Sequence, residues 1–493
     1  MLAQLLRRKA LADATSESEE PENRLKRTLS AVDLTALGIG AIIGAGIFSS
    51  TGTAVAGGGG HIGAGPALIV SYVLVAVACG FAALCYAEMA SMIPIAGSAY
   101  TYSYATMGEL IAWTIGWDLI LEYAMGAATV SVGWSGYVVA FLRDFLNINL
   151  PAAWTTAPFA YDEAASQFVS TGAILNVPAV FITMLATIIL VVGIKESARF
   201  NAVIVFVKVV VVLLFIVIGA RVVRPENWHP FIPPNLGPGR YGFTGIMRGA
   251  SAVFFAYIGF DAVSTAAQET KHPQKDLPTG ILGSLAICTV LYIAASLVLT
   301  GIVPYPQLSV PHPVGLGAKM TGIGWLEAAV EIGAVAGLSS VMIVMLMGQP
   351  RVFFSMAMDG LFPKFATKVH PRFGTPYITT IITGVACAIA GGLLPIGVLG
   401  HLVSIGTLFA FVLVSLGVMI LRVRRPDIPR AFRVPGGPYL VPLCGAASAL
   451  YIILSAGIDT QLRLVIWMAI GLVIYVAYGR RHSKLRAAAR AQR

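Results

Sequence analysis

The sequence predicts an all-α polytopic membrane protein with twelve transmembrane helices, and three observations support this prediction. The first is composition: 57% of the 493 residues are hydrophobic and 11% are charged, which excludes a soluble globular domain and a disordered chain. The second is the recurrence of apolar runs of about 20 residues, each long enough to cross a hydrocarbon core of roughly 30 Å. The third is an unequal distribution of basic residues between alternate connections.

The apolar runs define the predicted spans in chain order. They lie at residues 32–56, 66–93, 108–142, 178–194, 198–222, 244–269, 278–303, 325–356, 376–396, 399–421, 438–457 and 461–479. The third and eighth runs exceed the thickness of a bilayer, so we expect these two helices to tilt or to protrude.

The basic residues set the predicted orientation. With the N-terminus inside, the inner segments hold 24 of the 33 lysines and arginines and the outer segments hold 6, while Lys208, Arg248 and Arg351 lie within spans. This asymmetry predicts that both termini are cytoplasmic in a multi-pass protein of the cell membrane. The net charge of +10 is then a topology signal, so we expect no nucleic-acid partner.

Two predicted helices contain glycine-weakened segments, at residues 38–48 and 249–261. The first has four glycines in the nine residues from Gly38 to Gly46. In hydrocarbon, an open backbone N–H or C=O costs several kcal/mol unless protein, water or a ligand satisfies it. Breaks in two spans therefore predict a small-molecule site near mid-membrane. The alternative is that the glycines only allow close helix packing.

The two breaks occur in the first and sixth spans, which run in opposite directions. This predicts two inverted repeats of five helices, followed by two extra helices. The corresponding division of the chain is a cytoplasmic tail at 1–30, repeats at 31–222 and 223–421, helices 11 and 12 at 422–480, and a second cytoplasmic tail at 481–493.

The ends of the broken helices predict the kind of ligand. A half-helix that begins near Gly46 directs free N–H groups and the positive end of its dipole at the ligand, which suits a carboxylate. Half-helices that end near Ile42 and Ile258 present carbonyls without intrahelical partners, which suit an ammonium group. The sequence therefore predicts a zwitterion bound by main-chain atoms.

Several motifs resemble those of the amino acid–polyamine–organocation superfamily, in its branch of cationic amino acid transporters and their bacterial relatives. The runs at 38–48 and 255–261 resemble the signatures of its first and sixth helices. Tyr86-Ala-Glu88 with the run at 94–100 resembles the motif after helix two, and Asp359-Gly-Leu-Phe-Pro363 resembles the motif after helix eight. The resemblance covers residues 27 to 480.

The resemblance implies roles for individual residues at the breaks. The substrate carboxylate would bind the N–H groups of Ala45 and Gly46, and the amine would bind the carbonyls of Ile42, Phe255 and Ile258. Relatives often carry Ser or Thr at the Ala45 position, so this chain keeps the N–H and lacks the hydroxyl.

Met345, in the eighth predicted span, would bound the pocket for the substrate side chain according to the same resemblance. The main-chain groups bind only the carboxylate and the amine, which all amino acids share. The choice between small neutral and cationic substrates therefore stays open at this point.

Lys208 lies about ten residues into the fifth span, or roughly 15 Å deep. A cation there costs several kcal/mol unless it is paired or neutralised, so this amine is suited to release and regain a proton. In the resembling family, a lysine at this position replaces the sodium ion of sodium-coupled members. The resemblance adds Asp261, Glu122 and Tyr292 to a proton-coupling network with Lys208. The alternative is a static cation paired with Asp261 or Glu122.

The predicted function is secondary active transport of amino acids by alternating access, as a proton symport without sodium or another cofactor. An exchanger, a uniporter or an amino-acid receptor are the alternatives. An ATP-driven pump is disfavoured because the chain lacks a G-x-x-x-x-G-K-[ST] loop, and a channel because it lacks repeated filter-like segments. The five cysteines form no CxxC pair and His401 stands alone, so we expect neither a metal site nor an enzyme. The expected partners are the substrate and the lipid bilayer, and the Gly57–Gly60 run has no assigned role.

Overall fold

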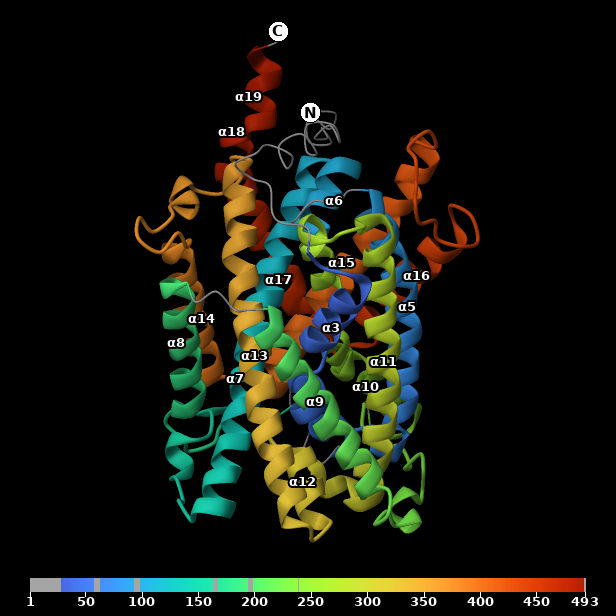
Figure 1. The fold of residues 1–493 in the computed structure, drawn as a ribbon, viewed down its shortest axis with the longest axis vertical. Helices are drawn as coiled ribbons and strands as arrows, with labels where there is room; N and C mark the ends of the chain where they lie inside the picture. The colour runs from blue at the N-terminus through green and yellow to red at the C-terminus, as the bar shows by residue number, and fades with distance from the viewer. Residues whose placement is uncertain are drawn as a thin grey trace.

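The computed structural model describes residues 28–56, 63–92, 98–162, 167–193, 198–237 and 239–491. Most of the N-terminal tail and the Gly57–Gly60 run lie outside the described residues. Figure 1 shows long helices that run roughly parallel to the longest axis of the molecule.

The helical segments of the first half range from three residues in η2 to 38 residues in α7. They are α3 (Ala31–Ile42), η1 (Gly46–Ser50), α4 (Thr51–Ala56), η2 (Gly65–Ala67), α5 (Leu68–Met92), α6 (Ser98–Thr106), α7 (Glu109–Leu146), η3 (Ala152–Trp154), α8 (Val177–Val192), α9 (Ala198–Gly219), η4 (Pro225–Trp228) and α10 (Gly242–Val253).

The second half continues in the same way. Its segments are η5 (Phe254–Tyr257), η6 (Asp261–Glu269), α11 (Pro273–Ile302), η7 (Tyr305–Leu308), α12 (Pro313–Met320), α13 (Gly324–Met358), η8 (Lys364–Thr367), α14 (Tyr377–Leu393), α15 (Ile396–Arg424), α16 (Leu440–Ser455), α17 (Ile458–Ile474), η9 (Tyr475–Gly479), α18 (Arg480–His482) and α19 (Lys484–Ala491).

Eight helical stretches of the described residues are long and apolar enough to cross a membrane. They are Ala31–Ala56, Gly65–Met92, Glu109–Leu146, Ala202–Gly219, Pro273–Ile302, Gly324–Met358, Ile396–Arg424 and Ile458–His482. Three shorter apolar helices, α8, α14 and α16, accompany them. The part of the chain that the structure describes is therefore helical apart from one short hairpin, and its apolar helices indicate a multi-pass membrane protein.

The centre of the bundle is the pair α7 and α13, which pack along each other. Small residues let the two helices approach closely, as is common where lipid supplies no hydrophobic driving force. A Cβ on Gly116 of α7 would lie 2.8 Å from the sulfur of Met356, and one on Gly126 would lie 3.5 Å from the sulfur of Met345. The 38 residues of α7 span roughly 57 Å, which agrees with the expectation that this helix exceeds the hydrocarbon core.

A hairpin and two short helices are among the elements that were not predicted from the sequence. Strands β1 (Phe159–Asp162) and β2 (Gln167–Ser170) form an antiparallel hairpin in which Phe159 is opposite Ser170. The short helices α6 and α12 lie in connections between spans. All three are too short to leave a clear periodic pattern in the sequence.

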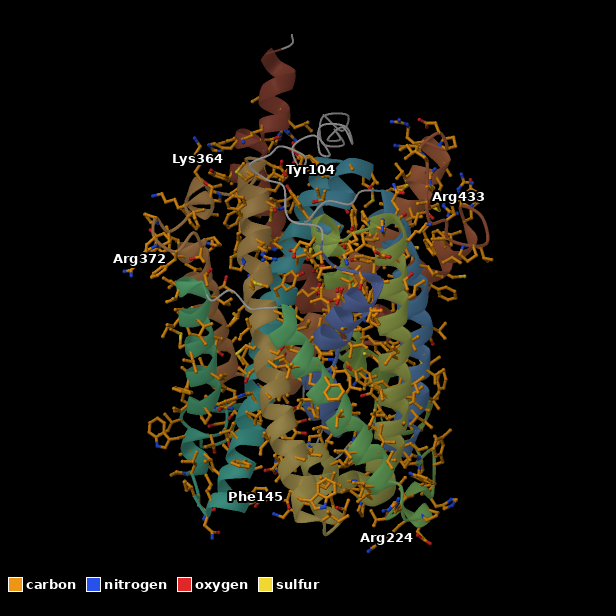
Figure 2. All side chains as sticks on the ribbon, in the orientation of Figure 1. Tyr104, Phe145, Arg224, Lys364, Arg372 and Arg433 are labelled. Atoms are coloured by element: carbon orange, nitrogen blue, oxygen red, sulfur yellow. The ribbon has the colours of Figure 1, made fainter. Side chains whose placement is uncertain are left out.

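The molecule has two ends, which we name by the elements found there. Figure 1 shows α6 and α19 at one end, the tail face, and α12 at the opposite end, the α12 face. Figure 2 places Lys364, Arg372 and Arg433 toward the tail face, and Phe145 and Arg224 at the α12 face.

Two buried glutamates hold the chain together at the tail face. Glu88 of α5 accepts hydrogen bonds from Arg422, from Arg430 at 3.2 Å and from the N–H of Val434 at 2.8 Å. Glu109 at the start of α7 accepts from Tyr475 at 2.8 Å and forms an ion pair with Arg486 at 3.0 Å. These contacts attach the segments that follow α15 and α17 to the bundle.

Candidate functional site

The first break lies within the stretch Ala31–Ala56. Helix α3 ends at Ile42, Ile43 is extended, and the chain becomes helical again in a π-helical turn that begins at Gly46. This turn continues directly into α4. The bounds are those that the glycine pattern predicts. Single π-helical turns are rare and occur frequently at functional sites.

The second break separates η5 from η6. The peptide after Tyr257 leaves the helical conformation, because Ile258 is extended and Gly259 has a φ of +122°. Side chains rarely adopt this φ, so glycine is required at this position. The main chain is thus open at Ile258, where the sequence predicts free carbonyl groups.

The two breaks contact each other through glycines. A Cβ on Gly46 would overlap the main chain of Ala256, and one on Gly259 would lie 2.8 Å from the carbonyl carbon of Ala41. Close helix packing, the alternative left open by the sequence, therefore does apply to these two glycines. The same packing brings the open ends of both breaks to one buried place.

The predicted substrate-binding residues surround this contact. Ala45 precedes the π-helical turn and Gly46 is its first residue, so their N–H groups lie at a helix start where such groups lack intrahelical partners. The carbonyl of Phe255 accepts from the N–H of Ile258 at 3.3 Å, and both side chains are at most 5% exposed.

Met345 belongs to the wall formed by α13. One turn before it on the same helix, Val341 lies 3.0 Å from the point where a Cβ of Gly44 would be. On its other side Met345 packs on Gly126 of α7. Helix α13 thus contacts the first break through Val341 and α7 through Met345, whose side chain is 4% exposed.

Lys208 and Tyr292 hold the carbonyl end of α3. The Nζ of Lys208 donates to the carbonyl of Gly40 at 2.8 Å and to that of Ile43 at 3.2 Å. The hydroxyl of Tyr292 donates to the carbonyl of Ile42 at 2.7 Å. Lys208 is fully buried and forms no ion pair with a carboxylate in the described part of the chain. Its charge is thus met by main-chain dipoles.

The acidic members of the predicted network lie in a separate group. Glu122 interacts electrostatically with Asp261 and with Asp118, and all three are buried. Both oxygens of Asp118 and one of Glu122 have no hydrogen-bond partner among the described residues, and Asp261 accepts from the N–H of Gly259 at 3.3 Å. Within the described part of the chain, no ion pair joins Lys208 to Glu122 or to Asp261.

Several residues around the first break escaped the sequence reasoning. The hydroxyl of Tyr137 donates to the carbonyl of Phe48 at 2.6 Å, and that of Tyr72 lies 2.7 Å from the hydroxyl of Thr51. Asp118 had no assigned role. A hydroxyl in an apolar span needs a hydrogen-bond partner, so the sequence already marks such tyrosines as residues of interest. Which group the hydroxyl contacts depends on the fold.

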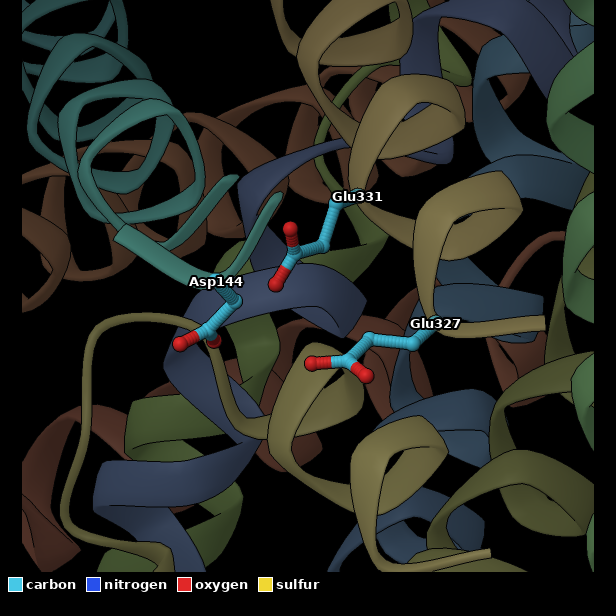
Figure 3. A group of neighbouring side chains, drawn as sticks. All are labelled: Asp144, Glu327 and Glu331. Atoms are coloured by element: carbon cyan, nitrogen blue, oxygen red, sulfur yellow. The ribbon is translucent and has the colours of Figure 1, made fainter. Parts of the chain in front are cut away.

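Figure 3 shows three acidic side chains, Asp144, Glu327 and Glu331, that direct their carboxylates toward one another. Their oxygens lie within 4.8 Å of one another, a spacing that a metal ion could bridge. The ammonium of Lys319 lies 2.9 Å from Asp144 and 3.9 Å from Glu327, so a cationic side chain already occupies this group. Burial, followed by the charge of Arg143, lowers the pKa of the nearby His312 to about 4.

Comparison with known families identifies the chain's relatives. The family model described as "Amino acid permease" matches residues 29–476. The chain belongs to this family. The resemblance inferred from the motifs of the first and sixth helices is thereby confirmed.

Individual relatives differ in their named substrates. The branched-chain amino acid permease BcaP of Bacillus subtilis (strain 168) is 49% identical over 98% of this chain and 100% of its own length. The methylthioribose transporter of the same strain is 46% identical over 98% of this chain and 100% of its own length. The vacuolar cationic amino acid transporter 4 of Arabidopsis thaliana is 37% identical over 86% of this chain and 68% of its own length.

Proposed function

We propose that this protein is a secondary active transporter that carries amino acids across the cell membrane by alternating access. The observation that carries this proposal is the meeting of two broken helices at Gly46 and Gly259, which gathers open N–H and carbonyl groups in one buried place. Membership of the amino acid permease family supports the same function.

The proposed topology has twelve spans with both termini cytoplasmic. The eight long stretches, the three shorter helices and the broken segment at 242–269 together make twelve. Breaks in the first and sixth of these favour two inverted repeats of five helices. The excess of basic residues toward the tail face favours a cytoplasmic tail face, so the α12 face would be the outer one.

In the proposed substrate complex, the carboxylate binds the N–H groups of Ala45 and Gly46. The amine binds carbonyls of Ile42, Phe255 and Ile258, and the oxygen of Ile42 keeps a second lone pair besides its bond to Tyr292. The walls contributed by Phe255, Ile258 and Met345 are apolar. They favour a neutral aliphatic side chain, as does the 49% identity to a branched-chain amino acid permease.

A second candidate substrate is methylthioribose, because a transporter named for it is 46% identical over nearly the whole chain. Methylthioribose carries neither a carboxylate nor an ammonium group. The N–H groups at Ala45 and Gly46 would then have only hydroxyl oxygens to bind. Competition between the two ligand classes therefore separates the candidates.

We further propose that transport is coupled to protons through Lys208. The charged amine donates to two carbonyls at the end of α3, next to the proposed amine site. Loss of a proton from the Lys208 amine would weaken these two hydrogen bonds, and the end of α3 would then be able to move. Such a link between protonation and the first break is what proton symport requires.

The test is uptake of labelled leucine into proteoliposomes with an inward proton gradient. We expect accumulation above equilibrium that a protonophore abolishes, and inhibition by excess isoleucine or valine. Uptake that arginine or methylthioribose blocks as well as isoleucine would reject the proposed substrate class. Uptake that never exceeds equilibration would reject proton coupling.

A further inference from the structure

A cavity of about 390 Å³ lies between the helix breaks and the α12 face. Its floor includes Thr53 of α4 and Ser251 of α10, which lie on the α12 side of the two breaks. Its walls come from the starts of α15 and α17 and from strand β1. The volume is within the range of sites for small molecules. The cavity lies outside the break residues described above.

Two arginines from different helices line this cavity. The guanidinium of Arg463, in α17, lies 4.7 Å from the centre of the Tyr161 ring, and it forms no ion pair with a carboxylate among the described residues. The guanidinium of Arg248, in α10, lies 3.6 Å from the point where a Cβ of Gly457 would be. Both positive charges act on the ring of His401, which lines the same cavity.

One carboxylate completes the polar lining. Asp459 accepts a hydrogen bond from the hydroxyl of Tyr161 at 2.8 Å. Tyr161, a residue of strand β1, therefore contacts Asp459 through its hydroxyl and Arg463 through its ring. The cavity thus presents two guanidinium groups and one carboxylate. Guanidinium binds carboxylate through paired, charge-assisted hydrogen bonds, and an acid on the same wall can accept from an ammonium group.

We propose that this cavity is a second binding site for a zwitterionic amino acid, occupied before the substrate reaches the helix breaks. The carboxylate of the ligand is held by Arg463 and Arg248, and its ammonium group is held at Asp459. The proposal rests on the proposed function, because it takes the ligand to be the transported substrate. Converging positive charge at an entrance raises the local concentration of an anionic group and its association rate.

Gly397 offers a reporter for occupancy of the cavity. It lies on the cavity wall, and a Cβ added there would meet no atom within 4 Å. Four native cysteines are buried, namely Cys79, Cys85, Cys288 and Cys387, and the fifth, Cys444, is partly exposed. A Gly397→Cys variant in a Cys444→Ala background therefore gives one reactive thiol, which a membrane-impermeant maleimide can label in proteoliposomes.

We expect leucine to slow this labelling at least about tenfold. Added Arg463→Gln or Arg248→Gln should remove the protection, whereas Arg221→Gln, an exposed arginine after α9, should leave it unchanged. Protection should persist when Gly46→Ala is added, because that change closes only the site at the breaks. Protection that survives both arginine substitutions, or that disappears with Gly46→Ala, would overturn the proposal.

Equilibrium binding of labelled leucine to the purified full chain supplies an independent readout. We expect two leucines per wild-type chain and one per Arg463→Gln chain. A single leucine per wild-type chain, with normal uptake into proteoliposomes, would reject the second site and leave the proposed function intact. Absence of both uptake and binding by the wild type would instead reject the proposed function.

Discussion

Lys208 shows how one residue can be located from sequence while its partners cannot. Its depth in the fifth span follows from counting residues, and so does the need to compensate its charge. The alternative to a coupling role was a static cation paired with Asp261 or Glu122, whereas the amine donates to the carbonyls of Gly40 and Ile43. Those carbonyls are open because α3 stops at Ile42, which the local glycine pattern predicts. They meet Lys208 because α3 packs beside α9, and no local pattern reveals that contact.

Replacing Lys208 with methionine tests its role in coupling. The change removes the titrating amine and leaves two carbonyl oxygens without their donor, which costs about 1–3 kcal/mol of stability for each buried group. We expect the proton gradient to lose its effect on leucine uptake, while leucine exchange between the two sides persists. Lys275→Met, which changes an exposed lysine in the first turn of α11, is the matched control. Full gradient-driven accumulation by Lys208→Met would show that another group carries the proton.

At the scale of elements, the broken helices could be predicted and the short connecting elements could not. Residues 38–48 carry their glycines within one segment, so the ends at Ile42 and Gly46 follow from local sequence. The hairpin β1–β2 and helix α12 depend on contacts with distant parts of the chain. Tyr161, for example, is held by Asp459 nearly 300 residues later.

The contact between Gly46 and Ala256 gives a prediction for the elements that it joins. A methyl group on Gly46 would overlap the main chain of Ala256, so Gly46→Ala must push the two breaks apart. In an Arg463→Gln background, where the site at the breaks is the one that binds leucine, we expect the affinity for leucine to fall by more than about tenfold, which corresponds to about 1.4 kcal/mol. Gly80→Ala in α5 meets no atom within 4 Å and should leave the affinity of the same background unchanged. Equal binding by both variants would mean that the contact does not form the site.

The whole molecule combines properties that composition determines with others that only tertiary structure determines. The apolar helices and the asymmetry of basic residues follow from the composition of the chain. The separation of Lys208 and Tyr292 from Glu122 and Asp261, and the cavity beneath the hairpin, follow from how helices pack. The sequence therefore locates the two breaks in the main chain, whereas the side-chain contacts around them depend on tertiary structure.

The orientation of the whole molecule is tested with two cysteines at opposite ends. Lys364 is an exposed residue toward the tail face and Arg224 an exposed residue at the α12 face (Figure 2). In intact cells, a membrane-impermeant maleimide should label Arg224→Cys and should label Lys364→Cys only after the membrane is permeabilised. The reverse pattern would invert the proposed topology and would turn the arginine-lined cavity toward the cytoplasm.

The central claim is that two broken helices recognise the carboxylate and the ammonium group of one amino acid through main-chain atoms. The most direct measurement uses the purified Arg463→Gln protein, in which the site at the breaks is the one that binds leucine. Labelled leucine is displaced from it by leucine, by leucinol, which lacks the carboxylate, and by 4-methylpentanoate, which lacks the amine. Because each charged hydrogen-bonded group contributes about 1.5–3 kcal/mol, we predict that both analogues bind more than about tenfold more weakly than leucine. Displacement by leucinol or 4-methylpentanoate at the same concentration as leucine would contradict the claim.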